Sequence, residues 1–123
     1  MTVAVRFAAA SELPVLMEEL ARAGLASSTL DGSAIEDGPA LLAALGKALA
    51  FPAYYGRNWD AAEECLRDLG ERYPQGAALV IARATALWQR LPREMGLLTA
   101  LWLGASETAA IPLRLVFLLE PEP

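Results

Sequence analysis

The chain has 123 residues, of which 55 % are hydrophobic, and it carries a net charge of −5. That length fits one domain with its own core, and the composition is too apolar for a disordered segment. Binding nucleic acid through phosphates requires clustered lysine and arginine, and no such cluster is present, so direct nucleic-acid binding is not expected. An acidic domain of this kind is better suited to a basic protein partner.

Several classes of chemistry lack their usual residues. The chain has no histidine, which removes the commonest general base and the commonest metal ligand. Neither zinc spacing nor a phosphate loop is found, so no metal and no cofactor are predicted. The single cysteine, Cys65, cannot form an internal disulfide, which fits a reducing compartment and predicts a cytoplasmic protein. No apolar run approaches the roughly 18 to 20 residues of a membrane span, and no signal peptide is recognised.

The first third of the chain predicts a strand, a helix and a second strand. Apolar and other residues alternate over residues 2–7, which indicates a short strand. A helical pattern follows, with Ser11 as its expected N-cap and Gly24 as its stop. Residues 25–30 are compatible with a strand and end at an Asp-Gly turn signal.

Two helices are predicted in the middle of the chain. Asp37 is a good N-cap for the first, and Pro52 requires that this helix end by about Ala50. The second is expected to begin near Asn58 and to run to Leu69, with Gly70 as its stop.

The last third predicts two strands around a buried helix. The apolar runs at 77–82 and 113–119 are typical of covered parallel strands. Between them, Thr85 is expected to cap a short turn, residues 93–104 to form a helix and residues 106–110 a loop. Strands separated by helices predict a small α/β domain with a largely parallel sheet.

The helix expected over residues 58–69 separates into two faces at about 100° per residue. The apolar face holds Trp59, Ala62, Cys65, Leu66 and Leu69. The polar face holds Asp60, Glu63, Glu64, Arg67 and, if the last turn extends that far, Glu71. Such a stripe is often an ordinary solvated surface. The preceding tyrosines and glycine are more typical of a protein-binding surface.

The loop before this helix contains residues of both kinds. We expect Tyr55 to be packed and Tyr54 to be more exposed, Gly56 to supply backbone freedom and Asn58 to cap the helix. Cys65 has no histidine to act as its base, so a small buried hydrophobe is the favoured role. The carboxylates on one outward face define no glycosidase pocket. No catalytic residues and no enzyme are therefore predicted.

One segment resembles a known family. Residues 51–66 read FPAYYGRNWDAAEECL, after LDG at 30–32 and a leucine-rich helix, and this pattern is similar to the barstar family, intracellular inhibitors of the ribonuclease barnase. The resemblance covers about residues 29–69. It implies a three-stranded parallel sheet packed with helices over residues 25–123, with residues 1–24 as an N-terminal strand–helix extension packed on the core.

The resemblance also implies a binding site and a mode of action. A helix and its preceding loop would enter a cationic nuclease active site and take the place of substrate phosphate. The partner-binding residues implied at matching positions are Tyr54, Gly56, Asn58, Asp60, Glu63 and Glu64. Glu64 lies where the family has a shorter aspartate, and Glu63 lies where it has an interface tryptophan. The family's further acid has no counterpart in the apolar segment 97–104.

The expected function is therefore inhibition of a basic ribonuclease, or immunity to another nuclease toxin, by a cytoplasmic monomer that does not engage membranes. The alternative is an interaction module of the same fold whose partner is not a nuclease.

Overall fold

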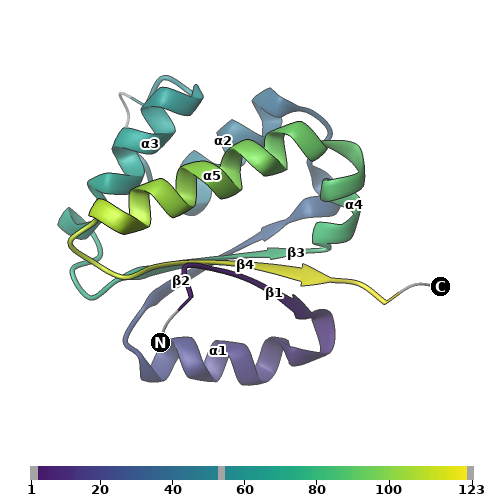
Figure 1. Cartoon of the computed structure of the whole chain (residues 1–123), viewed down its shortest axis with the longest axis horizontal. Coiled ribbons are helices and arrows are strands. Elements are labelled where there is room, and N and C mark those ends of the chain that lie inside the picture. Colours follow the sequence, from purple (N-terminus) through teal and green to yellow (C-terminus); the bar gives the residue numbers. More distant parts are fainter. Residues whose placement is uncertain (1–2, 53–54, 122–123) are drawn as a thin grey trace.

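The computed structural model describes residues 3–52 and 55–121, which form a parallel sheet with strand order β1-β4-β3-β2 (Figure 1). The strands are β1 (Val5–Ala9), β2 (Ala26–Asp31), β3 (Ala77–Ala82) and β4 (Leu113–Leu119). The central strands β3 and β4 are almost entirely buried, which explains why they read as continuous apolar runs. The prediction of a small α/β domain with a parallel sheet is confirmed.

Helices cover both faces of the sheet. They are α1 (Leu13–Arg22), α2 (Gly38–Ala48), α3 (Trp59–Arg67), α4 (Ala84–Arg90) and α5 (Pro92–Thr108), with 3-10 turns at Ala10–Glu12, Gly32–Ala34 and Leu69–Glu71. Figure 1 shows α1 alone on one face and the other four helices on the opposite face. Right-handed crossovers require this division, because the chain crosses the sheet one way from β1 to β2 and returns from β2 to β4.

Each face has its own hydrophobic core. The larger core lies between the sheet and α2–α5, and it contains the fully buried Trp102 and Phe117. The smaller core lies under α1, where Leu16 and Leu20 belong to the same cluster as Val80 of β3. Trp102 belongs to the segment that the sequence predicts as a buried helix, and its burial agrees with that prediction.

The expected number of strands is wrong: the sheet has four strands, not three. The extra strand is β1, which lies parallel to β4 with Val5 opposite Leu115. The Leu115 amide donates to the Ala4 carbonyl at 2.8 Å, and the Phe7 ring stacks on Phe117 with centroids 5.0 Å apart. The family resemblance does not reach these residues, so only their alternating pattern pointed to a strand.

The N-terminal helix starts differently from the expectation. A 3-10 turn precedes α1, and Ser11 lies inside this turn rather than at a helix cap. Glu12 closes the turn by accepting the Ala9 amide at 2.7 Å. Gly24 follows the helix with φ +78°, a left-handed conformation that glycine adopts at low cost, so its predicted role as a stop is confirmed.

Two boundaries near the C-terminus also differ. Thr85 is not a cap, because α4 already begins at Ala84, and the Thr85 hydroxyl accepts the Glu120 amide at 3.1 Å. The expected loop at 106–110 is helical as far as Thr108. Ser106 donates its hydroxyl to a carbonyl in the preceding turn, so this polar residue is accommodated within the helix.

The LDG segment fastens the carboxyl ends of β2 and β3 together. The Asp31 carboxylate accepts from Arg83 Nε at 2.8 Å and from Nη2 at 2.7 Å, and it also accepts the Ser33 amide and hydroxyl. A Cβ on Gly32 would lie 2.7 Å from the Arg83 carbonyl oxygen, so the two chain segments approach too closely for a side chain there. The bond from Arg83, with help from Ser33, holds the pKa of Asp31 well below its usual range.

Helix α3 begins at a side-chain cap. Asn58 has extended backbone angles, and its Oδ1 accepts the Ala61 amide at 2.8 Å. This bond satisfies one of the amides that a helix start leaves without an intrahelical partner. The predicted capping role of Asn58 is confirmed.

The interaction of Asp31 with Arg83 predicts that an Asp31 variant differs from wild type in stability by an amount that depends on pH. The pKa of Asp31 is lower in the folded state than in the unfolded state. Below about pH 4 the unfolded state therefore binds more protons, and the contribution of the Asp31–Arg83 interaction to the free energy of unfolding declines as the pH falls. Asp31→Asn should therefore lower the urea midpoint at pH 7, and the difference in midpoint between this variant and wild type should become smaller toward pH 3. The control Glu18→Gln, at an exposed ion pair on α1, should shift the midpoint little. A gap that stays constant down to pH 3 would contradict the role assigned to Asp31.

The cap predicts a second stability effect. Asn58→Ala should destabilise the protein by about 1 kcal/mol, because the Ala61 amide loses its acceptor. Asn58→Asp should retain most of the stability, since a carboxylate can accept the same bond and suits the helix start. Urea denaturation of the three proteins measures both effects, and equal midpoints for Asn58→Ala and wild type would refute the cap.

Candidate partner-binding surface

The loop between α2 and α3 is held against α2 by Tyr55. Its hydroxyl donates to the Leu42 carbonyl at 3.1 Å, and its ring meets Phe51 edge-on with centroids 4.9 Å apart. Burial raises the pKa of Tyr55 to about 12. Tyr55 is packed, as the sequence analysis predicts, whereas Tyr54 lies outside the described residues.

The backbone turn before α3 differs from the prediction in one respect. Arg57, and not Gly56, has the left-handed conformation, with φ 54°. The proposed reason for Gly56 is therefore wrong. A Cβ at this position would come within 3.2 Å of Asn58 Nδ2, so the glycine leaves room for the capping side chain.

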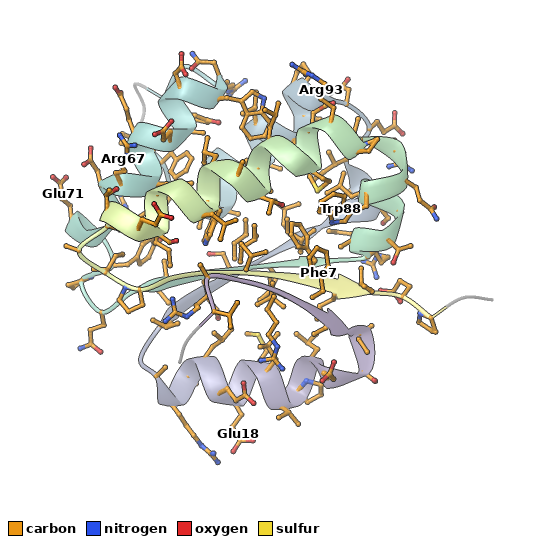
Figure 2. The ribbon with its side chains drawn as sticks, viewed as in Figure 1. Phe7, Glu18, Arg67, Glu71, Trp88 and Arg93 are labelled. Atoms are coloured by element: carbon orange, nitrogen blue, oxygen red, sulfur yellow. The ribbon has the colours of Figure 1, made fainter. Side chains whose placement is uncertain are left out.

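The acidic face of α3 points away from the core. Asp60 and Glu64 are exposed and lie one helical turn apart. Glu63 is less exposed and forms an ion pair with Arg67, which Figure 2 places at the outer side of the molecule. Among the described residues, neither Asp60 nor Glu64 forms an ion pair. The face therefore presents two carboxylates without an ion-pair partner among the described residues, those of Asp60 and Glu64, beside the ion pair of Glu63 with Arg67.

The opposite face of α3 anchors the helix. Ala62, Cys65 and Leu66 are buried, and Trp59 packs partly buried against the larger core. Burial raises the pKa of the Cys65 thiol, and nearby carboxylates act in the same direction. A thiol held in its protonated form is a poor nucleophile, which agrees with the structural role predicted for Cys65.

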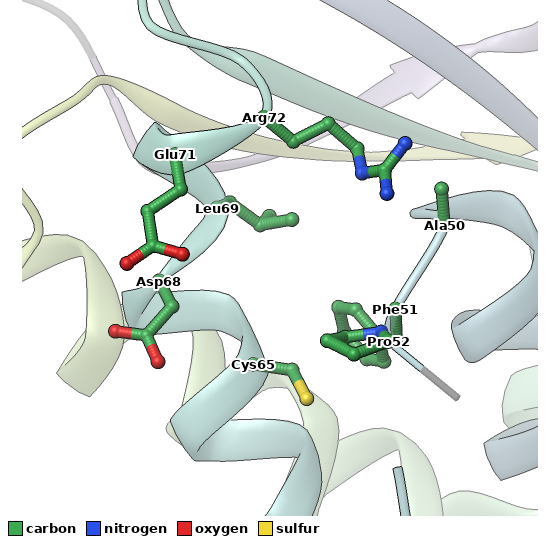
Figure 3. Close-up of a pocket in the computed structure, with 8 residues that line it drawn as sticks. All are labelled: Ala50, Phe51, Pro52, Cys65, Asp68, Leu69, Glu71 and Arg72. Atoms are coloured by element: carbon green, nitrogen blue, oxygen red, sulfur yellow. The ribbon is translucent and has the colours of Figure 1, made fainter. Parts of the chain in front are cut away.

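A pocket of about 370 Å³ lies between the segment that follows α2 and the C-terminal end of α3 (Figure 3). Its lining residues are Ala50, Phe51, Pro52, Cys65, Asp68, Leu69, Glu71 and Arg72. The α-helix ends at Arg67, so Glu71 comes from the following 3-10 turn rather than from the last turn of α3. Asp68 and Glu71 are exposed acidic residues beyond the end of α3. Of the two, the sequence pattern predicted only Glu71 as part of the acidic face.

The structure brings together most of the predicted contact residues. Gly56, Asn58, Asp60, Glu63 and Glu64 all lie on α3 or directly before it. No group of three or more potential metal ligands occurs in the described part of the chain. Within the same residues, no helix is both long and apolar enough to cross a bilayer.

Comparison with known proteins agrees with this geometry. The family model described as barstar (barnase inhibitor) matches residues 25–117, well over half of the chain, including the whole of α2, the loop and α3. No curated protein sequence matched the chain. Members of the matched family are inhibitors rather than enzymes, and their partner is a ribonuclease. The chain belongs to the barstar family.

Proposed function

We propose that this protein is a cytoplasmic inhibitor, or immunity protein, that binds a basic ribonuclease or another nuclease toxin and occludes its active site. One observation carries the proposal. Asp60 and Glu64 are exposed and have no ion-pair partner among the described residues, on a helix that a cap and an apolar face hold in place. Two such carboxylates complement the cationic site with which a nuclease binds phosphate.

In this proposal, carboxylates of the inhibitor replace the phosphates of the substrate in the active site of the nuclease. The carboxylates of Asp60 and Glu64 would occupy positions that substrate phosphates take, so that substrate and inhibitor compete for the same cations. Since α3 is already ordered by Asn58 and by its buried face, little conformational freedom is lost on binding. The net charge of −5 would attract a basic partner over several ångströms, in a manner that salt screens.

The remaining contact residues contribute in different ways. Glu63 would present less net charge than Glu64, because Arg67 neutralises it within the helix. Gly56 and Asn58 would bring backbone and amide groups to the rim of the contact. Tyr54 is proposed as a contact from the family motif alone, since it lies outside the described residues.

The two glutamates favour a target that differs from barnase. Glu64 extends its carboxylate one methylene further than an aspartate would, and Glu63 replaces an aromatic contact by a charged pair. A site shaped for the shorter acid would meet a different surface. This difference also supports the second candidate, an interaction module whose partner is not a nuclease. Capture of partners from the native host, followed by an RNA-protection assay, separates the two.

The acidic face predicts a separation of binding from stability. Asp60→Ala and Glu64→Ala should each weaken binding to a basic, guanine-preferring ribonuclease at least about tenfold, because a desolvated cation loses its partner. Their stability should change by less than about 0.5 kcal/mol, since both residues are exposed.

Glu18→Ala is the matched control, because it removes the same charge from α1, across the sheet from α3 (Figure 2). It should leave the affinity nearly unchanged. Titration calorimetry and thermal unfolding provide the two readouts. Loss of stability with full affinity in the α3 variants would show that these acids serve the fold instead.

The ion pair on α3 predicts a gain of function. Arg67→Gln removes a cation from the acidic face and frees Glu63, so association with the same ribonuclease should become several-fold faster at low salt. The advantage should fade at about 0.5 M salt, where charges are strongly screened. Stopped-flow measurements test this, and slower association at low salt would show that Arg67 itself contacts the partner.

A further inference from the structure

Gly46, near the end of α2, occupies the position on which the ring of Tyr55 rests. A Cβ at Gly46 would lie 2.7 Å from Tyr55 Cε2 and 2.8 Å from Cδ2. These distances are shorter than carbon atoms tolerate, so the ring fills the space that any other side chain would need. The loop and α2 therefore approach as closely as they do because residue 46 has no side chain.

Two carbonyls of α2 hold the loop by hydrogen bonds. Leu42, one turn before Gly46, accepts the Tyr55 hydroxyl at 3.1 Å. The carbonyl of Gly46 accepts the Phe51 amide at 2.9 Å, and Ala50 between them has φ 53°. This is the pattern of a Schellman ending, in which the residue after a left-handed one bonds back to the helix.

Helix propensity gives no reason for a glycine at this site. Glycine weakens a helix interior relative to alanine. Alanine occupies several neighbouring positions of α2, including Ala44 and Ala48. The contact with the Tyr55 ring is the feature that distinguishes position 46, since a Cβ on Gly96 or Gly104 of α5 would meet nothing within 4 Å.

The position of Tyr55 governs how the chain enters α3. Its amide donates to the Pro52 carbonyl at 2.9 Å, and Gly56 follows it directly. Two residues later Asn58 caps the helix that carries Asp60. A displacement of the Tyr55 ring would therefore be transmitted to the start of the acidic face.

We propose that Gly46 is a positioning residue for the partner-binding surface: it admits the Tyr55 ring and so sets the loop in its binding geometry. This inference rests on the proposed function for its consequence in binding. Gly46 itself lies beneath the Tyr55 ring and acts through it, and substitution there should alter binding without changing any charge.

The test compares three glycine-to-alanine variants of the whole chain. Gly46→Ala should accelerate amide hydrogen exchange at Phe51 and Tyr55, whose amides are hydrogen-bonded, about tenfold. Dissociation from the basic, guanine-preferring ribonuclease should become faster by a similar factor, with little change in the association rate. Gly96→Ala and Gly104→Ala should raise the thermal midpoint and leave loop exchange and dissociation as in wild type.

A double-mutant cycle separates positioning from general packing. In a Tyr55→Ala background no ring remains to be displaced, so Gly46→Ala should have no further effect on loop exchange or dissociation. An equal effect in both backgrounds would overturn the proposal. So would wild-type loop exchange in Gly46→Ala, or accelerated exchange with unchanged dissociation.

The Asp60→Ala variant distinguishes a refuted positioning role of Gly46 from a refuted inhibitor function. If Asp60→Ala weakens binding while Gly46→Ala does not, the inhibitor function stands and the positioning role is refuted. If the wild-type protein does not bind the ribonuclease, the proposed function fails for this target. The loop-exchange cycle then decides alone whether Gly46 positions Tyr55.

Discussion

The chain has to leave α2 and enter α3 within a short loop, and the rest of the surface depends on how that loop is held. Pro52 prevents α2 from continuing, and the left-handed Ala50 turns the backbone out of the helix. Tyr55 then returns to α2 and bonds to Leu42. Tyr55 therefore packs the part of the loop next to α3 against α2, which holds the start of the acidic helix in place.

The family motif divides into residues that build the scaffold and residues that remain free to bind. Asp31 and Gly32 of the LDG segment join the carboxyl ends of two strands through Arg83. Tyr55 and Asn58 fasten the loop and begin α3. Asp60 and Glu64 make no ion pair among the described residues, so the proposed contact residues are separate from those that hold the fold.

Charge on α3 is also distributed unevenly. Arg67 forms an ion pair with Glu63 within the helix, whereas Asp60 and Glu64 form no ion pair among the described residues. The surface is thus less acidic at one position than the sequence alone indicates. Asp60 and Glu64 lie one helical turn apart, and the Glu64 side chain is one methylene longer than that of Asp60.

Local pattern was enough to predict the parallel α/β class, the positions of most strands and helices, the Asn58 cap and the two faces of α3, because each depends on near neighbours in the chain. It could not predict that residues 5–9 add a fourth strand beside β4, since that pairing joins segments about a hundred residues apart. The left-handed residue before α3 is Arg57 and not Gly56, and a Cβ on Gly56 would come within 3.2 Å of the capping Asn58, a contact that local pattern did not reveal. The sequence pattern likewise gave no sign of the positioning role proposed for Gly46. Only packing brings the Tyr55 ring onto Gly46, one of the two glycines of α2.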